Sequence, residues 1–273
     1  MIRIISFALL AGAAALVVPL EALATQVGTP PVVRSAAIDQ PTVAYAKADS
    51  FTYHVVRPEN PSGQTFVLFH GSGGDETSLV KLATKIAPGA TLIGIRGRIT
   101  QEGRTRWYKR VSPVSFDQED IRSESEALVG FLDRTARDLE IDLQRAVFIG
   151  YSNGANLIAA TALLHPGLVH KAALLRPMSV LNEPPLAALK GASMLMVAGA
   201  SDSVYAPYAP ALQKLLTSCG ATVDARTIAS DHAIGDMDAE IVSQWLAAAS
   251  TASPAIPAAG ASAIPVMDVA AEQ

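Results

Sequence analysis

The chain has 273 residues, of which 50% are hydrophobic and 17% are charged, and its formal net charge is −4 at pH 7. This composition is typical of a globular protein with a large core, and it gives no electrostatic reason to expect a nucleic-acid partner. The single cysteine, Cys219, excludes an internal disulfide and a metal site built from several cysteines. No group of His, Asp and Glu residues has metal-ligand spacing either, so we expect no metal.

The first 24 residues have the layout of a secretory signal peptide. Arg3 precedes an apolar run over residues 4–18, and Ala22-Leu23-Ala24 supplies an Ala-x-Ala cleavage signal. The run is shorter than the about 20 residues that a membrane-spanning helix needs. We expect cleavage after Ala24, export to the periplasm or the medium, and no stable membrane span afterwards. An uncleaved anchor is the alternative.

Composition divides the remaining chain into three parts. Residues 25–48 are rich in proline and small residues and predict a linker, whose last residues could form an edge strand. Residues 250–273 are rich in Ala, Pro and Ser with few large apolar residues, which predicts a disordered tail. A single folded domain is expected from Asp49 to Ala249.

Strand and helix patterns alternate within that domain. Short apolar runs predict strands over residues 65–69, 91–95, 147–149, 171–175 and 194–198, and alternating patterns predict strands over 51–56 and 222–228. Apolar periodicity and stop signals predict helices over residues 76–86, 118–139, 153–164, 208–219 and 235–249. Asp117 is the predicted cap of the second of these helices. Such alternation predicts an α/β fold with a mostly parallel central sheet and helices on both faces.

A nucleophile elbow is predicted at Gly150-Tyr151-Ser152-Asn153-Gly154. This Gly-x-Ser-x-Gly lies between a buried strand and a helix of small residues, which is the context that such an elbow requires. Glycine is needed on both sides because the turn is too tight for side chains. The turn would present the Ser152 hydroxyl at its apex, so Ser152 is the predicted nucleophile.

Two strand ends supply a candidate acid and base for Ser152. A serine needs a base to take its proton and a third group to orient that base, and in α/β-hydrolases the chain order is Ser, acid, His. Asp202 follows the strand 194–198, and His232 follows the strand 222–228. Both lie at strand carboxyl ends, where open α/β sheets collect their ligand sites. Ser152, Asp202 and His232 are therefore the predicted triad.

Other assignments stay open beside this one. Asp231 could be the acid in place of Asp202, although adjacent loop residues rarely face each other, and Asp202 could instead cap the next helix. The histidines expected to be structural or exposed are His54, His165 and His170.

The glycine-rich loop His70-Gly71-Ser72-Gly73-Gly74 follows an early strand and predicts an oxyanion hole. Its donors would be the backbone N–H groups of Ser72 and of Asn153, the residue after the nucleophile. A flexible turn or a phosphate loop is the alternative, but the Gly-Lys-Ser/Thr ending of a Walker loop is missing.

The pocket itself is less well specified. The stretch from Arg96 to Arg110 holds six basic residues and could attract an acidic substrate, or it could be a solvated loop. Three side chains are expected to line the pocket: Trp107, Tyr108 and Met178. The proline-broken insertion over 177–190 is short, which predicts a minimal lid.

Together these motifs resemble the phospholipase/carboxylesterase family of α/β-hydrolases, in particular small bacterial serine esterases related to acyl-protein thioesterases and dienelactone-hydrolase-like proteins. The stretches that carry the resemblance are residues 69–76, 106–110, 116–120, 150–156, 175–178 and 199–202. The resemblance implies an α/β-hydrolase fold without cofactor, with Ser152, Asp202 and His232 at the triad positions. Asp231 stands where family members usually have glycine, and it could raise the basicity of His232 or face solvent.

The expected function is that of a serine carboxylesterase acting on short-chain or small carboxylic esters through an acyl-enzyme. A lysophospholipase or acyl-thioesterase acting on longer chains is one alternative. A non-catalytic binding protein with a hydrolase fold is another. The expected partner is a small-molecule ester, and the oligomeric state is left open.

Overall fold

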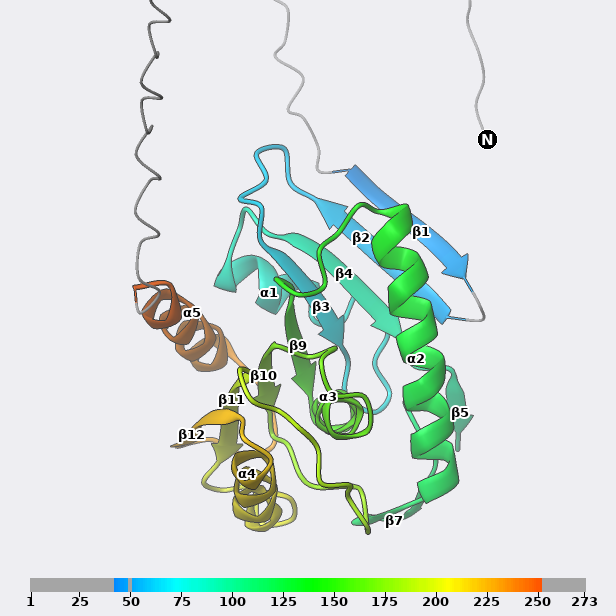
Figure 1. Cartoon of the computed structure of the whole chain (residues 1–273), viewed down its shortest axis with the longest axis vertical. Helices are drawn as coiled ribbons and strands as arrows, with labels where there is room; N and C mark the ends of the chain where they lie inside the picture. Colours follow the sequence, from blue (N-terminus) through cyan, green and yellow to red (C-terminus); the bar gives the residue numbers. More distant parts are fainter. Residues whose placement is uncertain (1–41, 49–50, 252–273) are drawn as a thin grey trace, which may run out of the picture. The chain divides into compact units, whose positions relative to one another are not determined.

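A twisted eight-stranded sheet forms the centre of the protein (Figure 1). The computed structural model describes residues 42–48 and 51–251. The strands stand in the order β1-β2-β4-β3-β9-β10-β11-β12. Their bounds are Thr42–Ala48 (β1), Phe51–Arg57 (β2), Thr65–Phe69 (β3), Thr91–Arg96 (β4), Val147–Tyr151 (β9), Lys171–Leu175 (β10), Ser193–Gly199 (β11) and Thr222–Ile228 (β12). Strand β2 runs antiparallel to β1 and β4, and the strands from β4 to β12 are all parallel, which confirms the predicted mostly parallel sheet.

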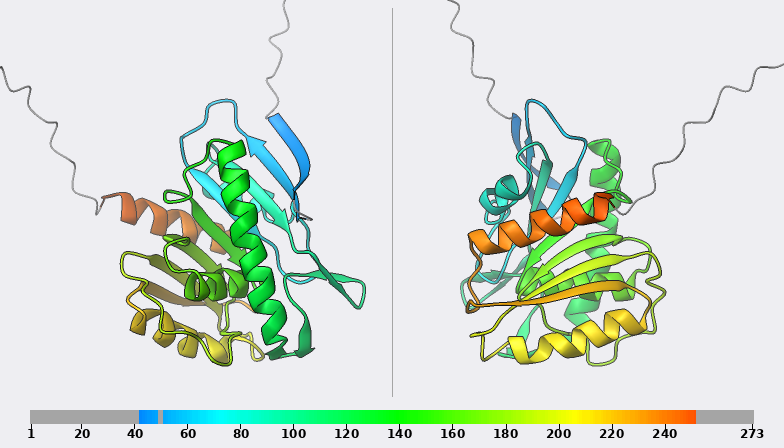
Figure 2. Two further views of the ribbon diagram at one scale, coloured as in Figure 1. Left: turned by 45° about the vertical axis from the view of Figure 1, so that its right-hand side comes forward. Right: turned by 90° about the vertical axis from the view of Figure 1, so that its left-hand side faces the viewer.

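Helices cover both faces of this sheet, as predicted (Figure 2). They are Val80–Ile86 (α1), Gln118–Asp138 (α2), Asn153–Leu164 (α3), Ala209–Ser218 (α4) and Asp236–Thr251 (α5), with a short 3₁₀ helix at Ala206–Tyr208 (η1). Alternate strand residues point to opposite faces. In β3, Val67 and Phe69 share a core cluster with α2, α3 and α4, whereas Phe66 and Leu68 share the other cluster with α1 and α5.

Local sequence explains where α2 and α1 begin. The carboxylate of Asp117 accepts the N–H groups of Glu119 and Asp120 at 3.1 and 3.0 Å, so the predicted cap of α2 is confirmed. Helix α1 begins at Val80, later than the predicted start at Glu76. The side chain of Asp75 accepts the N–H of Thr77, which stabilises a turn where the first helical residues were expected.

The sheet begins earlier than the predicted domain start at Asp49. Thr42–Ala48 pairs with β2 along its whole length, so the end of the expected linker is an edge strand of the sheet. The predicted signal peptide over residues 1–24, the rest of the linker and the tail from 252 onward lie outside the described residues. Within the described residues, no helix is long and apolar enough to cross a membrane.

The basic stretch after β4 contains two small hairpins. Ile99–Gln101 (β5) pairs with Arg104–Arg106 (β6), and Arg110–Ser112 (β7) pairs with Ser115–Phe116 (β8). The Gln101 side chain joins them, because it donates to the carbonyl of Arg110 at 2.8 Å and accepts its N–H at 2.9 Å. Strands of two or three residues carry too little periodicity to be predicted from sequence.

Candidate active site

Ser152 occupies a sharp turn between β9 and α3. Its φ of 50° and ψ of −114° place it in a region that residues with a side chain rarely adopt. A Cβ on Gly150 would lie 2.6 Å from Ile158 Cδ1, and one on Gly154 would lie 2.4 Å from the Phe69 carbonyl oxygen. The steric reason given for both glycines is therefore confirmed.

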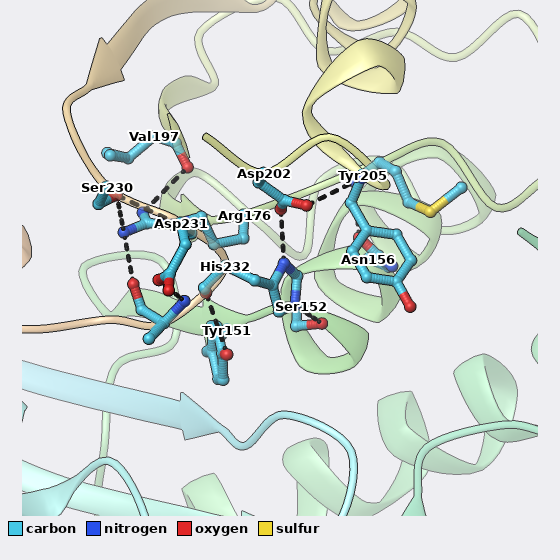
Figure 3. Close-up of polar contacts among 12 residues, drawn as sticks. Tyr151, Ser152, Asn156, Arg176, Val197, Asp202, Tyr205, Ser230, Asp231 and His232 are labelled. Atoms are coloured by element: carbon cyan, nitrogen blue, oxygen red, sulfur yellow. Dashed lines mark hydrogen bonds and ion pairs between the residues drawn. The ribbon is translucent and has the colours of Figure 1, made fainter. Parts of the chain in front are cut away.

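The predicted nucleophile, base and acid are in contact (Figure 3). His232 Nε2 lies 2.8 Å from Ser152 Oγ, and His232 Nδ1 lies 2.6 Å from Asp202 Oδ2. A carboxylate can only accept, so Nδ1 carries the proton and the lone pair of Nε2 faces the serine hydroxyl. Asp202 is buried, which keeps its carboxylate away from water.

The neighbouring carboxylate, Asp231, does not bond to the imidazole ring. It is exposed, and its Oδ1 accepts the N–H of Ala233 at 2.8 Å, so it stabilises the turn that carries His232. The helix-capping alternative for Asp202 is also partly realised. Its Oδ1 accepts the N–H of Tyr205 at 3.0 Å, just before η1, while Oδ2 faces the histidine.

The other histidines contact structural partners. His170 Nε2 lies 2.8 Å from the carbonyl of Gly167, and His165 Nε2 lies 3.5 Å from the Glu126 carboxylate. His54 is buried in β2. These positions agree with the structural roles expected for them.

Two backbone N–H groups near Ser152 are candidate oxyanion donors. In the glycine loop, the N–H of Gly73 donates to Thr105 and that of Gly74 donates to Gly71, at 2.8 and 3.0 Å. Among the backbone hydrogen bonds of the described residues, the N–H groups of Ser72 and Asn153 have no acceptor. Asn153 is also the first residue of α3, where the helix dipole favours negative charge.

His70 fixes the conformation of this glycine loop. Its Nε2 accepts the N–H of Gly97 at 3.0 Å, so Nδ1 carries the proton and donates to the carbonyl of Gly71 at 2.7 Å. Burial lowers the pKa of His70, which keeps the ring neutral. The Trp107 ring stacks on it at 5.1 Å, and Trp107 Nε1 donates to the His70 carbonyl at 2.9 Å. His70 is therefore a support of the loop.

A hollow of about 10 Å³ lies over the serine. It is small beside the roughly 300–1,000 Å³ that is typical of ligand pockets. Its lining residues are Arg110, Phe116, Ser152, Asn153, Asn156, Arg176, Met178 and Tyr205. Met178 thus lies where the sequence predicted it.

The expectation that Trp107 and Tyr108 line the pocket is wrong. Both side chains are buried at 1% exposure or less, beneath the surface of the hollow. Trp107 is held by His70, and the Tyr108 ring packs edge-on against Phe116 at 5.3 Å. Burial also raises the pKa of Tyr108. These rings support the pocket from behind.

Sequence reasoning missed three side chains that hold His232. The Tyr205 ring lies 4.7 Å from the imidazole, centroid to centroid, and Tyr151 Oη donates to the His232 carbonyl at 3.1 Å. Arg176 is buried and donates to three acceptors of the loop around the histidine (Figure 3). The sequence did offer one signal for Arg176: it directly follows β10, and the carboxyl ends of parallel strands lie at the edge of the sheet that carries the site.

This arrangement can perform acyl transfer: a hydroxyl faces an imidazole lone pair, and two backbone donors lie nearby. Within the described residues, no group of three or more His, Cys, Asp or Glu side chains could hold a metal ion.

Comparisons with known proteins point to the same chemistry. No protein-family profile matches the chain. MhqD of Bacillus subtilis (strain 168), which is named as a hydrolase, is 32% identical over 186 residues, or 67% of this chain and 92% of MhqD. The structure of a carboxylesterase from Mesorhizobium loti is similar with a TM-score of 0.73 and 48% identity, covering 75% of this chain and 98% of that one. The Bacillus cereus carboxylesterase has a TM-score of 0.70 and 28% identity, covering 73% and 94%.

Proposed function

This chain belongs to the phospholipase/carboxylesterase family of α/β-hydrolases and is a hydrolase of ester bonds, and on that basis we propose that it is a serine carboxylesterase for short-chain or small esters. The observation that carries the proposal is the continuous hydrogen-bonded line from Ser152 through His232 to Asp202. The small hollow over Ser152 supports the restriction to small acyl groups.

In the proposed reaction, Ser152 Oγ attacks the ester carbonyl while His232 Nε2 takes the hydroxyl proton. Asp202 keeps the proton on Nδ1 and stabilises the imidazolium that forms. The N–H groups of Ser72 and Asn153 donate to the developing oxyanion. The imidazolium then protonates the leaving alcohol, and water hydrolyses the acyl-enzyme by the same sequence of proton transfers.

Replacing the nucleophile tests this mechanism. Ser152→Ala should lower kcat for 4-nitrophenyl butyrate by at least about 10⁴-fold, because the acyl-enzyme cannot form. A fluorophosphonate probe should label the wild-type protein and not this variant. Ser201→Ala, at an exposed serine of the neighbouring loop, is the matched control and should keep both activity and labelling. Wild-type turnover by Ser152→Ala would refute the mechanism, and a wild-type protein that neither turns over nor labels would favour a binding protein.

A series of 4-nitrophenyl esters from two to sixteen carbons tests the acyl preference. We expect kcat/KM to fall beyond about six carbons, because the hollow is smaller than the roughly 300 Å³ lower bound of typical ligand pockets. A maximum at twelve or more carbons would favour the lysophospholipase or acyl-thioesterase alternative.

We also propose export through the signal peptide over residues 1–24, on the sequence pattern alone. The full chain expressed in a Gram-negative host should appear in the periplasmic fraction with Thr25 as its first residue. Retention of Met1 would contradict cleavage.

A further inference from the structure

Two of the six basic residues between Arg96 and Arg110 differ from the others in their surroundings. Arg98 pairs with Glu124 at 2.8 Å, Lys109 pairs with Asp120 at 3.0 Å, and Arg96 pairs with Glu76. Arg104 is exposed on β6. The remaining two, Arg106 and Arg110, appear in none of the ion pairs that the described residues form.

One of these two arginines lines the hollow over Ser152, and the other contacts the glycine loop. Arg110 lines the hollow together with Ser152 and Asn153. Arg106 is buried at 4% exposure, and its Nη1 donates to Ser72 Oγ at 3.1 Å. Ser72 carries one of the two N–H groups proposed as oxyanion donors. Positive charge is therefore concentrated beside the carbonyl that Ser152 would attack.

The surroundings of both guanidinium groups are unfavourable without an anion. The Nε atoms of Arg106 and Arg110 are buried and have no hydrogen-bond partner within the described part of the chain. Buried polar groups are nearly always hydrogen-bonded, and a buried charge without a counter-charge is costly. Burial and the neighbouring charges of Arg110 and Arg104 lower the pKa of Arg106, although Glu102 and Tyr108 act in the opposite direction. A purely structural role would not explain why both buried Nε–H groups lack an acceptor.

We propose that Arg106 and Arg110 bind a carboxylate of the substrate, so that the enzyme prefers esters of small dicarboxylic acids over neutral esters of the same length. The inference rests on the proposed carboxylesterase function and names its substrate class. A guanidinium presents parallel N–H groups that match a carboxylate, and a hydrogen bond to a charged group is among the strong ones. Arg110 and Ser152 line the same hollow, so a carboxylate bound at Arg110 would be separated from the scissile ester by a short spacer.

A pair of matched substrates tests the proposal. The 4-nitrophenyl half-ester of adipic acid is anionic, and its methyl ester is neutral and of nearly equal length. Release of 4-nitrophenol is followed for both at fixed ionic strength. The wild-type protein should show a kcat/KM ratio, anionic over neutral, of about 10 or more.

Arg110→Gln is the main variant because Arg110 is only partly buried and its loss should leave the fold intact. It should lower the anionic-to-neutral ratio by about 10- to 100-fold, chiefly through KM for the anionic ester. Arg104→Gln removes the same charge from an exposed position of the same segment and should leave the ratio unchanged. Adipate itself should inhibit the wild-type protein competitively and should bind Arg110→Gln more weakly by a similar factor.

The possible failures are distinguishable. Turnover of the neutral ester that depends on Ser152, with a ratio near one or a ratio that Arg110→Gln does not change, would overturn the carboxylate site and leave the proposed function standing. Equal losses in Arg104→Gln and Arg110→Gln would also overturn it, because they would indicate general attraction by surface charge. Turnover of neither ester, or turnover of both by Ser152→Ala, would instead refute the proposed function.

Discussion

Arg176 holds the loop that carries His232, and its replacement by methionine should cost both stability and rate. The side chain is fully buried and pairs with Asp238 of α5, with Nη1 2.8 Å from Oδ1. The same guanidinium donates to the Asp231 carbonyl at 3.0 Å, to Ser230 Oγ at 3.0 Å and to the Ala233 carbonyl at 2.8 Å. These acceptors lie on both sides of the histidine.

The expected loss of stability follows from burial. Arg176→Met leaves the Asp238 carboxylate buried without its partner, and breaking a buried pair in this way costs about 3–5 kcal/mol. For a domain of this size, 1 kcal/mol changes Tm by about 2–4 °C, so Tm should fall by roughly 6–20 °C. Arg226→Met, which breaks the partly exposed pair with Asp224, is the matched control and should cost less than about 1 kcal/mol.

The double variant Arg176→Met/Asp238→Leu separates stability from positioning. Replacing a buried ion pair by apolar side chains is often neutral, so most of the lost Tm should return. The loop would still lack three hydrogen-bond donors, and a displacement of about 1 Å at His232 can lower the rate by about 10²-fold. We therefore expect kcat for a short-chain nitrophenyl ester to stay low in the double variant.

Circular dichroism melts and steady-state kinetics on the same preparations give both quantities. Recovery of wild-type kcat together with Tm in the double variant would show that the loop does not need Arg176. Wild-type stability in Arg176→Met would refute the reasoning on the buried pair.

Three further predictions concern single residues. Asp202→Asn should lower kcat by about 10⁴-fold, because the amide stabilises the wrong imidazole tautomer, and kcat close to wild type would contradict its orienting role. Gly154→Ala should lower Tm markedly or prevent folding, since its Cβ would meet the Phe69 carbonyl oxygen at 2.4 Å, whereas Gly235→Ala, with nothing within 4 Å, serves as the control. Burial holds the pKa of His70 below its usual 6.5, so the unfolded chain binds more protons below that pH. Stability should be full above about pH 6.5 and should fall as the pH drops towards the lowered value, and His70→Gln should flatten this slope in Tm measured from pH 7.5 to 5.

The sequence by itself determined the features that depend on neighbouring residues. The elbow at Ser152 could be predicted because a turn this tight excludes side chains at its flanking glycines. The cap of α2 at Asp117 followed from the need of a helix for an acceptor at its first N–H groups. Asp202 and His232 could be placed because each follows the end of a short predicted strand, and parallel strands bring their carboxyl ends to one edge.

Only the tertiary structure decided which side chains meet across the sheet. The aromatic residues Trp107 and Tyr108 looked like pocket residues, but packing against His70 and Phe116 buries them. The spacing of the arginines between residues 96 and 110 does not reveal which of them find a carboxylate, because those partners come from distant elements. Arg176 likewise reaches the histidine loop only because the strands lie in the order β9-β10-β11-β12. This order brings together residues that are more than fifty positions apart in the sequence. Local patterns report backbone geometry and burial, whereas the partners of a charged side chain are set by how the strands are ordered in space.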